Sequence, residues 1–325
     1  MKKKILFFIA TFFLLPIMAQ ATTIAPAVLQ VNLNPGQSGK YFLSLFNETA
    51  SDLYLSGSIG SFRPQGESGQ AQLVPPAVNN QSLSWLKMPV NSVLVKADQV
   101  VQIPLEINVP KNAEVGGYYL AALWQTASSP KRKTSQLNFS SQVGSLILLR
   151  VNGNVKEQLR VASFGSEKNR SVYDALPVNF NLKLKNEGNI HESPRGFVVI
   201  KNCLGRVVDA LPVNSEKGNI LPASTRQFAV VWTNGDNAQS DRSFISGLRQ
   251  ELKNPLIGPF TVQAQLAYGD KRQALESEKI SLWLIPWRIS LIVLIILLLI
   301  IVWRVVVWRK KRRRRKMMFD IKWPK

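Results

Sequence analysis

Residues 289–303 read ISLIVLIILLLIIVW, and thirteen of these fifteen residues are Leu, Ile or Val. Fifteen helical residues are too short for the hydrocarbon core of a bilayer, which is about 30 Å thick. The flanks supply the missing length, because residues 286–307 would form a helix of about 33 Å. Arg288 and Arg304 lie near its ends, where long cationic side chains reach the headgroups. We therefore predict a transmembrane helix over 286–307 rather than the buried helix of a soluble core. Tryptophans mark both rims, as interfacial indole rings do: Trp283, Trp287, Trp303 and Trp308.

The segment after this helix is strongly basic. Residues 309–316 read RKKRRRRK within a tail that extends over 308–325. Such a cluster could bind nucleic acid or anionic lipid. The positive-inside rule already explains it, however, because cations beside a span set its orientation. We predict a cytoplasmic tail that touches membrane lipid as a by-product, and no nucleic-acid partner. The residues in question are Arg309, Lys310, Lys311, Arg312, Arg313, Arg314, Arg315 and Lys316.

The first 21 residues have the pattern of a cleavable export signal. Three lysines precede an apolar run, which ends in Ala19-Gln20-Ala21. No cysteine follows the run, so the pattern of a lipoprotein is absent. A signal peptide over 1–21 and one late span predict a single-pass plasma-membrane protein with an extracellular N-terminal part. Much of the formal net charge of +21 then belongs to the tail, and the exported part is only mildly basic.

The exported part alternates as β-strands do. Val101–Val109 reads VQIPLEINV with apolar residues at every second position, and Pro104 on the outward side indicates an edge strand or a bulge. Val178–Lys185 and Phe260–Tyr268 alternate without a break, and no long segment before the span shows helical periodicity. Short strands separated by turn residues predict an all-β protein of two Ig-like β-sandwiches, followed by the transmembrane helix. We expect the first sandwich over 22–163, a linker over 164–171 and the second sandwich over 172–282.

The two predicted sandwiches share faint sequence features. Leu43–Thr49 and Leu182–Gly188 each read as a strand that runs into an Asn-Glu turn. Later in each block a strand starts at a glycine beside an aromatic residue, at Gly117-Tyr118 and at Gly258-Pro259-Phe260. Turns recruit Asn and Gly in many folds, so these features suggest a duplication without establishing it.

Residues for catalysis are scarce. The chain has one histidine, His191, which cannot build a multi-histidine metal site, and we expect it to lie in a turn. Its single cysteine, Cys203, is expected to be a buried small hydrophobe rather than a reactive thiol. G-x-S-x-G, phosphate-binding glycine loops and C-x-x-C are all missing. Paired carboxylates have no obligatory spacing and stay open. We predict a non-enzymatic protein without a cofactor or metal.

Aromatic residues of the first block are the candidate ligand-binding positions. Tyr118 and Tyr119 are adjacent in a predicted strand, so their side chains must point to opposite faces. One should enter the core and the other should face outward, near Trp124 or Trp85, where exposed rings could stack on sugars or anchor peptides. The alternative is that both tyrosines pack between the sheet and a covering loop.

The order of these features resembles the WxL-interacting surface proteins of Gram-positive bacteria. The resemblance rests on Asn34–Gln37, Phe46–Thr49, Ile107–Pro110 and Gly116–Tyr118, followed by a second sandwich, one span and a basic tail. It implies that the first domain binds peptidoglycan or another wall polymer and that the second binds a surface protein. The second block, with Asn186–His191, is closer to a general bacterial Ig-like surface domain.

Three functions remain open from the sequence. The first is a membrane-anchored surface protein whose sandwiches bind wall material or a surface protein. The second is an accessory or chaperone-like factor that assembles a membrane complex or a surface fibre through an exposed edge strand. The third is a hydrolase. Retention on purified wall material would favour the first, and co-purification with a protein would favour the second.

Overall fold

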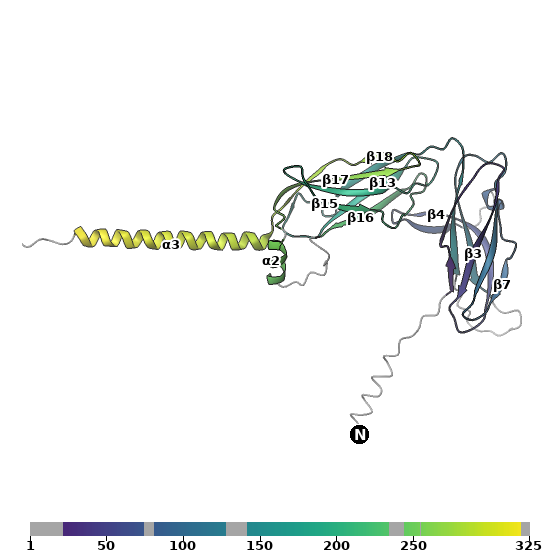
Figure 1. The fold of residues 1–325 in the computed structure, drawn as a ribbon, viewed down its shortest axis with the longest axis horizontal. Coiled ribbons are helices and arrows are strands. Elements are labelled where there is room, and N and C mark those ends of the chain that lie inside the picture. The colour runs from purple at the N-terminus through teal and green to yellow at the C-terminus, as the bar shows by residue number, and fades with distance from the viewer. Residues whose placement is uncertain (1–21, 75–80, 128–141, 234–243, 254, 320–325) are drawn as a thin grey trace, which may run out of the picture. The chain divides into compact units, whose positions relative to one another are not determined.

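The computed structural model describes residues 22–74, 81–127, 142–233, 244–253 and 255–319. The predicted signal peptide, 1–21, lies outside the described residues. The chain forms two compact units, and Figure 1 shows the packed sheets of each. Unit 1 extends to Gln158 and includes Asn186–His191 and Leu221–Ser224, and unit 2 contains the remainder.

Unit 1 is a sandwich of two sheets. Its elements are β1 (Thr22–Ala25), β2 (Val28–Leu33), β3 (Ser38–Asn47), β4 (Leu53–Gln65), β5 (Gln70–Val74), the 3-10 helix η1 (Gln81–Trp85), β6 (Leu86–Lys87), β7 (Ser92–Val95), β8 (Val100–Asn108), β9 (Gly116–Thr126) and β10 (Gln142–Val151). One sheet has the order β1-β3-β8-β6, and the other has the order β2-β10-β9-β4-β5 with β7 also paired to β4. The core between the sheets contains the fully buried Trp124.

Unit 2 repeats this plan and adds two helices. Its elements are β11 (Leu159–Ser166), β12 (Val172–Tyr173), β13 (Val178–Asn186), β14 (Arg195–Asn202), β15 (Val207–Val213), β16 (Thr225–Trp232), α2 (Phe244–Lys253), β17 (Gly258–Tyr268), β18 (Gln273–Glu276), β19 (Ile280–Leu284) and α3 (Trp287–Phe319). The sheets have the orders β11-β13-β16 and β12-β19-β17-β14-β15, with β18 also paired to β17. Trp232 and Phe180 are fully buried in the core between them.

The two sandwiches have the same strand connectivity. The pair β3–β8 corresponds to β13–β16, and the path β2-β10-β9-β4-β5 corresponds to β12-β19-β17-β14-β15. The β2–β10 and β12–β19 pairs are both parallel, whereas the neighbouring β9–β10 and β17–β19 pairs are antiparallel. Strands β9 and β17 both begin at a glycine with a positive φ, at Gly116 and Gly258. The internal parallel in the sequence is therefore a repeat of the fold.

The two Asn-Glu turns are the most closely matched parts of this repeat. Asn47 ends β3, Asn186 ends β13, and both residues are fully buried. Each carboxamide nitrogen donates to the carbonyl oxygen four residues later, at 2.8 and 2.7 Å. Each side-chain oxygen accepts the backbone N–H two residues later, at 3.0 and 2.8 Å. Both turns carry the chain from one sheet of a sandwich to the other, so a buried amide closes each crossover.

The strand patterns of the sequence are confirmed. In Val178–Lys185 and Phe260–Tyr268, every second side chain is buried in the core of the second sandwich. In β8 the apolar residues at 103, 105 and 107 are buried, and Pro104 lies on the outer face. The two-residue β6 pairs only with Glu106 and Ile107, so β8 is an edge strand at Pro104, as expected.

Three features differ from the expectations. The division between the units falls at Leu159, because 159–166 forms β11, whereas the linker was expected at 164–171. The polar residues of β11 face outward from an edge strand, and they resemble a linker in the sequence. Cys203 is exposed in the β14–β15 hairpin rather than buried, because a tight turn places it outside the alternating strand. The ten-residue helix α2 was not expected.

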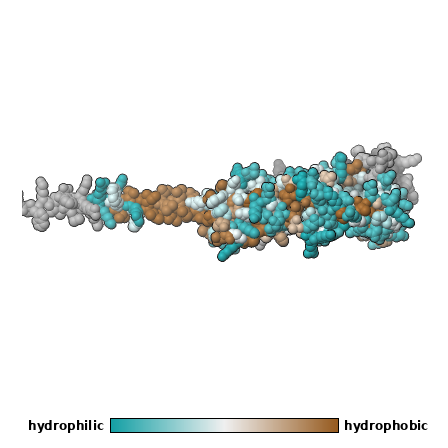
Figure 2. Space-filling view, turned by 90° about the horizontal axis from the view of Figure 1, so that it is seen from above, coloured by the Kyte–Doolittle hydropathy of each residue, from teal (hydrophilic) through white to brown (hydrophobic). Residues whose placement is uncertain are grey.

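Helix α3 is long and apolar enough to cross a membrane. Within Trp287–Arg312, the most apolar 18-residue window has a mean hydropathy of 3.1, and none of that window is buried against the rest of the protein. Figure 2 shows hydrophobic residues over most of its length. The helix begins one residue after the predicted start at 286 and continues through the basic segment to Phe319. The side chains of Arg313–Lys316 lie outside the described residues.

We predict that Asn47→Ala and Asn186→Ala each destabilise the protein, whereas Asn32→Ala does not. Each of the first two changes leaves buried backbone groups of a crossover without a partner, which costs about 1–3 kcal/mol. Asn32 has an exposed side chain in β2, so the same change there removes no buried group. Urea unfolding followed by tryptophan fluorescence measures the effect. Equal stabilities of all three variants would contradict the role of the amides.

Candidate functional site

Three of the four predicted ligand-binding aromatics belong to the core of the first sandwich. Trp124 is fully buried, so it cannot contact a ligand, and Trp85 is also buried. Tyr118 packs against Trp85 with ring centroids 4.5 Å apart, and its hydroxyl donates to the carbonyl oxygen of Glu114 at 2.9 Å. Burial and the nearby Glu114 carboxylate raise the pKa of Tyr118. The two tryptophans fill space between the sheets, and the half-buried ring of Tyr118 packs against this core.

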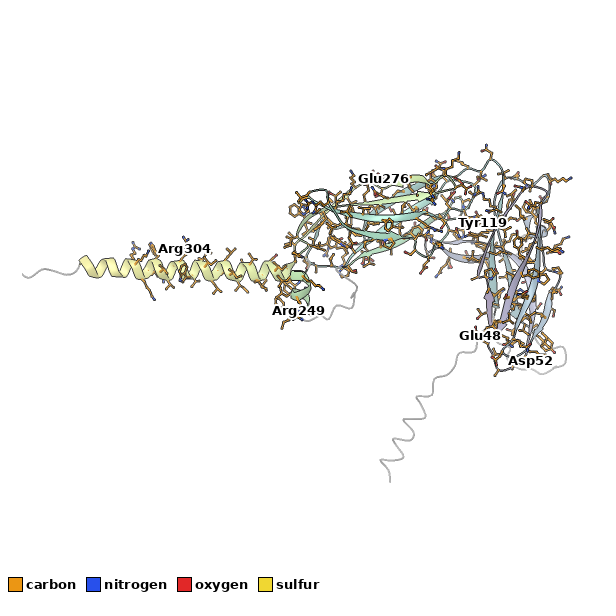
Figure 3. All side chains as sticks on the ribbon, viewed as in Figure 1. Glu48, Asp52, Tyr119, Arg249, Glu276 and Arg304 are labelled. Atoms are coloured by element: carbon orange, nitrogen blue, oxygen red, sulfur yellow. The ribbon has the colours of Figure 1, made fainter. Side chains whose placement is uncertain are left out.

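Tyr119 lies on the opposite face of β9, as strand alternation requires. Its ring makes edge contacts with Phe62 and with His191, each at a centroid distance of 5.9 Å. It belongs to a small apolar cluster that includes Ala121 and Leu221, all within unit 1. Figure 3 labels Tyr119 on its strand. Both tyrosines are half-buried, whereas Trp124 and Trp85 are buried, so these four side chains do not form one exposed aromatic surface. Ligand binding at Tyr118 and Tyr119 stays a prediction of the sequence.

His191 is a half-buried side chain whose environment favours the neutral imidazole. Burial, together with the positive charge of Arg150, lowers the pKa of His191 to about 4. Its Nδ1 atom is buried, and no hydrogen-bond partner for it is found in the described part of the chain. The described residues also contain no group of three or more His, Cys, Asp or Glu that could hold a metal. His191 therefore acts in packing against Tyr119.

Strand β16 presents an open edge. It is the last strand in the order β11-β13-β16, so its second side has no hydrogen-bonded neighbour among the described strands. The backbone N–H of Asn186 donates to the carbonyl oxygen of Ser224 at 2.9 Å, just before β16 begins. Hydrogen-bonded residue pairs alternate with non-bonded pairs along an antiparallel ladder. The backbone N–H and C=O groups of Phe228, Val230 and Trp232 therefore also bond to β13. The peptide groups of Gln227, Ala229 and Val231 consequently point to the open side.

The corresponding edge in the first sandwich is blocked. The backbone N–H of Asn47 donates to the carbonyl oxygen of Gln99 at 3.0 Å, and the backbone N–H of Asn186 donates in the same way to Ser224. Gln99 therefore corresponds to Ser224, and this correspondence aligns β8 with β16 residue by residue. Pro104 then corresponds to Ala229, and Glu106 corresponds to Val231. Proline lacks an N–H, charged residues resist strand pairing, and β6 covers the end of β8. These three protections are missing from β16.

The side chains of β16 suit the pairing of a further strand. Ala229 is exposed, and Val231 is 47% exposed beside the open edge. Arg226 is the one charged residue of β16, and its Nη1 atom donates to the carbonyl oxygen of Asn219 at 2.9 Å, at the start of the strand. The rest of the edge is uncharged and free of proline. An extended peptide could add to such an edge through backbone hydrogen bonds.

The open edge of β16 is not predictable from the sequence alone. The run Phe228–Trp232, FAVVW, reads as one apolar segment, and its alternation does not show which strand lies beside it. Phe42 was also not expected to be exposed, but its ring is 59% exposed on the outer face of β3, opposite Pro104 in the register. The exposure of Phe42 could have been predicted from strand alternation. Leu43 and Leu45 are buried in the core, so the even-numbered residues of the same strand face the outer side of the sheet.

No family model and no curated protein matches the chain. Solved structures of low identity do match it. One is a class 5 fimbriae chaperone, CfaA, with a TM-score of 0.41 and 11% identity over 80% of this chain and 99% of that one. The YadV chaperone has a TM-score of 0.37 and 11% identity over 80% and 99%. The Pseudomonas aeruginosa CupB2 chaperone has a TM-score of 0.37 and 11% identity over 81% and 100%. The two-sandwich fold itself is established by the strand orders above.

We predict that stability falls as the pH is lowered from 6.5 towards 4. Between these pH values the unfolded chain binds a proton at His191, because the ordinary pKa of histidine is 6.5. The folded chain does not bind this proton, because the pKa of His191 in the folded protein is about 4. Stability from the neutral imidazole is therefore present above pH 6.5 and decreases below it. Since His191 is the only histidine, its NMR titration is read directly. Folded protein titrating near 6.5, as the urea-unfolded control should, would contradict this assignment, and His191→Gln should remove this part of the pH dependence.

Proposed function

We propose that the protein is a membrane-anchored, non-enzymatic assembly factor that binds an extended segment of a partner protein along β16. The observation that carries this proposal is the contrast between β16 and β8. The two strands occupy the same place in the two sandwiches, yet Pro104 and Glu106 block one edge, and Ala229 and Val231 leave the other open.

The partner of this edge is an extended polypeptide. Alternate peptide groups of β16 offer N–H donors and C=O acceptors that are spaced for another strand. The exposed Ala229 and Val231 favour small or β-branched side chains beside them. A glycan would not satisfy such a regular row of backbone groups. The aromatic positions expected to bind wall polymer are packed, so peptidoglycan binding stays a prediction of the sequence alone.

Helix α3 holds this edge at a membrane. The apolar stretch Trp287–Arg312 would span the bilayer, and the basic residues that follow would keep the C-terminal end in the cytoplasm. The sandwiches would then lie on the outer side, as an export signal over 1–21 requires. A factor of this kind would act on a secreted or membrane-bound protein as it emerges at the cell surface.

We predict that a photocrosslinking residue at position 231 captures a partner protein and that Ala229→Pro strongly reduces the capture. The N–H of Ala229 points away from β13, so proline removes no ladder bond of the fold and is tolerated at an edge. Loss of a backbone hydrogen bond together with the proline ring should weaken binding by about tenfold. The measurement uses the full chain, in membranes of the cells that make it, and compares the yield of crosslinked product.

Two controls make the result specific. Ala229→Ser keeps the N–H and should leave crosslinking unchanged. The same photocrosslinker at Glu106, the corresponding position of β8, should give no product. Equal capture from positions 231 and 106, or full capture by Ala229→Pro protein that is folded by tryptophan fluorescence, would refute binding along β16.

We also predict that protease added to intact protoplasts removes the sandwiches and leaves a small fragment that contains α3. The basic tail on the cytoplasmic side would be protected by the bilayer. Immunoblotting against a tag placed after Lys325 detects the fragment. Protection of the sandwiches, with digestion of the tag, would mean the opposite orientation.

A further inference from the structure

Helix α2 carries an apolar arc that the described residues of unit 2 leave largely uncovered. Phe244, Ile245, Leu248 and Leu252 recur at helical spacing and share one side of the helix. Ile245 is 76% exposed, and Leu252 is 62% exposed. Arg249 and Lys253 lie on the polar side of the helix, and Arg249 is labelled at α2 in Figure 3. A short helix with exposed leucine and isoleucine beside cationic residues has the character of an interfacial segment.

Three contacts attach α2 to the first turn of α3. The ring of Phe244 makes an edge contact with Trp287 at 5.7 Å. Glu251 pairs with the Arg288 guanidinium at 2.8 Å and also accepts the backbone N–H of Ile289 at 3.3 Å. Arg288 and Glu251 are only 18% and 13% exposed, so the pair is well shielded.

Gly247 gives the Arg288 guanidinium the room it needs. A Cβ atom at position 247 would collide with that group. Glycine in the middle of a helix is normally destabilising relative to alanine. A side chain at position 247 would therefore require the Arg288 guanidinium to shift from its place beside Glu251.

These contacts set the direction of α2. The positions 244, 247 and 251 span about 10 Å along α2. They all touch residues 287–289, which occupy about 3 Å along α3. Two helices that ran side by side would share contacts over several turns, so α2 crosses the start of α3. Figure 1 shows α2 beside this end of α3.

The start of α3 is also the level at which the membrane surface must lie. Only Ile285 and Pro286 separate β19 from α3, and the N–H of Ile285 donates to the carbonyl oxygen of Tyr173 at 2.8 Å. Trp283 and Trp287 are exposed at this level, where indole rings favour the headgroup layer. A helix that crosses α3 here lies along the membrane surface.

We propose that α2 is an interfacial helix whose apolar arc inserts into the outer lipid leaflet, with Ile245 and Leu252 among the acyl chains and Arg249 at the headgroups. This inference rests on the membrane anchoring in the proposed function. The bilayer is the occupant because the exposed arc adjoins the exposed apolar surface of α3, which lipid would surround. The ion pair between Glu251 and Arg288 fixes α2 at that depth.

Spin labels test the depth of each position. In the full chain with Cys203→Ser, single cysteines are introduced by Ile245→Cys, Leu252→Cys, Arg249→Cys and Leu297→Cys, and each is labelled. The protein is reconstituted in vesicles of phosphatidylethanolamine and phosphatidylglycerol. Collision rates with oxygen, which concentrates in lipid, are compared with those of a water-soluble nickel chelate. We expect labels 245, 252 and 297 to favour oxygen several-fold over the label at 249.

The label at Leu297 separates the two proposals. If 297 favours oxygen while 245 and 252 react with nickel as readily as 249 does, the interfacial helix is refuted and the anchor stands. If 297 itself reacts with nickel, the anchor is refuted as well. Labels at 245 and 252 shielded from both reagents would mean that protein covers the arc, which also overturns the inference. Because these side chains are exposed, the substitutions should not disturb folding.

Discussion

The buried carboxamide at the end of β3 and of β13 is the constraint on which both sandwiches depend. A sandwich closes only if the chain crosses from one sheet to the other, and a crossover exposes backbone groups that no ladder satisfies. Asn47 and Asn186 supply a donor and an acceptor at the right separation, and the peptide N–H of each is tied to the strand alongside. A serine would reach too few groups, and an aspartate would place a charge in the core. The backbone N–H bonds of Asn47 to Gln99 and of Asn186 to Ser224 fix the ladder phase in β8 and β16, and so they determine which peptide groups face outward.

Much of this architecture could be predicted from the sequence, because strand alternation follows directly from burial. Val178–Lys185 alternates since one face of β13 lies in the core, and Pro104 marks an open edge since it can donate no ladder bond. Roles that depend on partners far away in the chain could not be predicted. Trp124 looks like a candidate ligand contact until the opposing sheet encloses it, and Cys203 has apolar neighbours but lies in a turn. Helix α2 is too short for its periodicity to stand out, and its packing depends on Arg288, far along the chain.

The joint between the second sandwich and α3 determines how closely this helix is attached to the fold. With two residues between β19 and α3, and with the Glu251–Arg288 pair beside them, α3 is attached to unit 2 without a flexible tether. An ion pair as shielded as this one loses hydration on burial, so it needs close and well-directed partners. The N–H of Ile289 provides one, because Glu251 binds the guanidinium and the helix start together. The open edge of β16 belongs to the same unit as this joint, so a partner bound there would be held on the unit that carries α3.

The open edge of β16 is not required by the fold. Gln227, Ala229 and Val231 turn their peptide groups away from β13, so substitution there breaks no ladder bond, and the first sandwich accommodates proline at the corresponding position. Protection of this edge would therefore cost the fold little. Exposed edges favour aggregation, and exported proteins generally block them with proline, charge or a covering strand. The edge of β16 could be blocked at little cost, and the corresponding edge of the first sandwich is blocked in three ways. This contrast supports the proposed pairing of β16 with a strand of a partner protein.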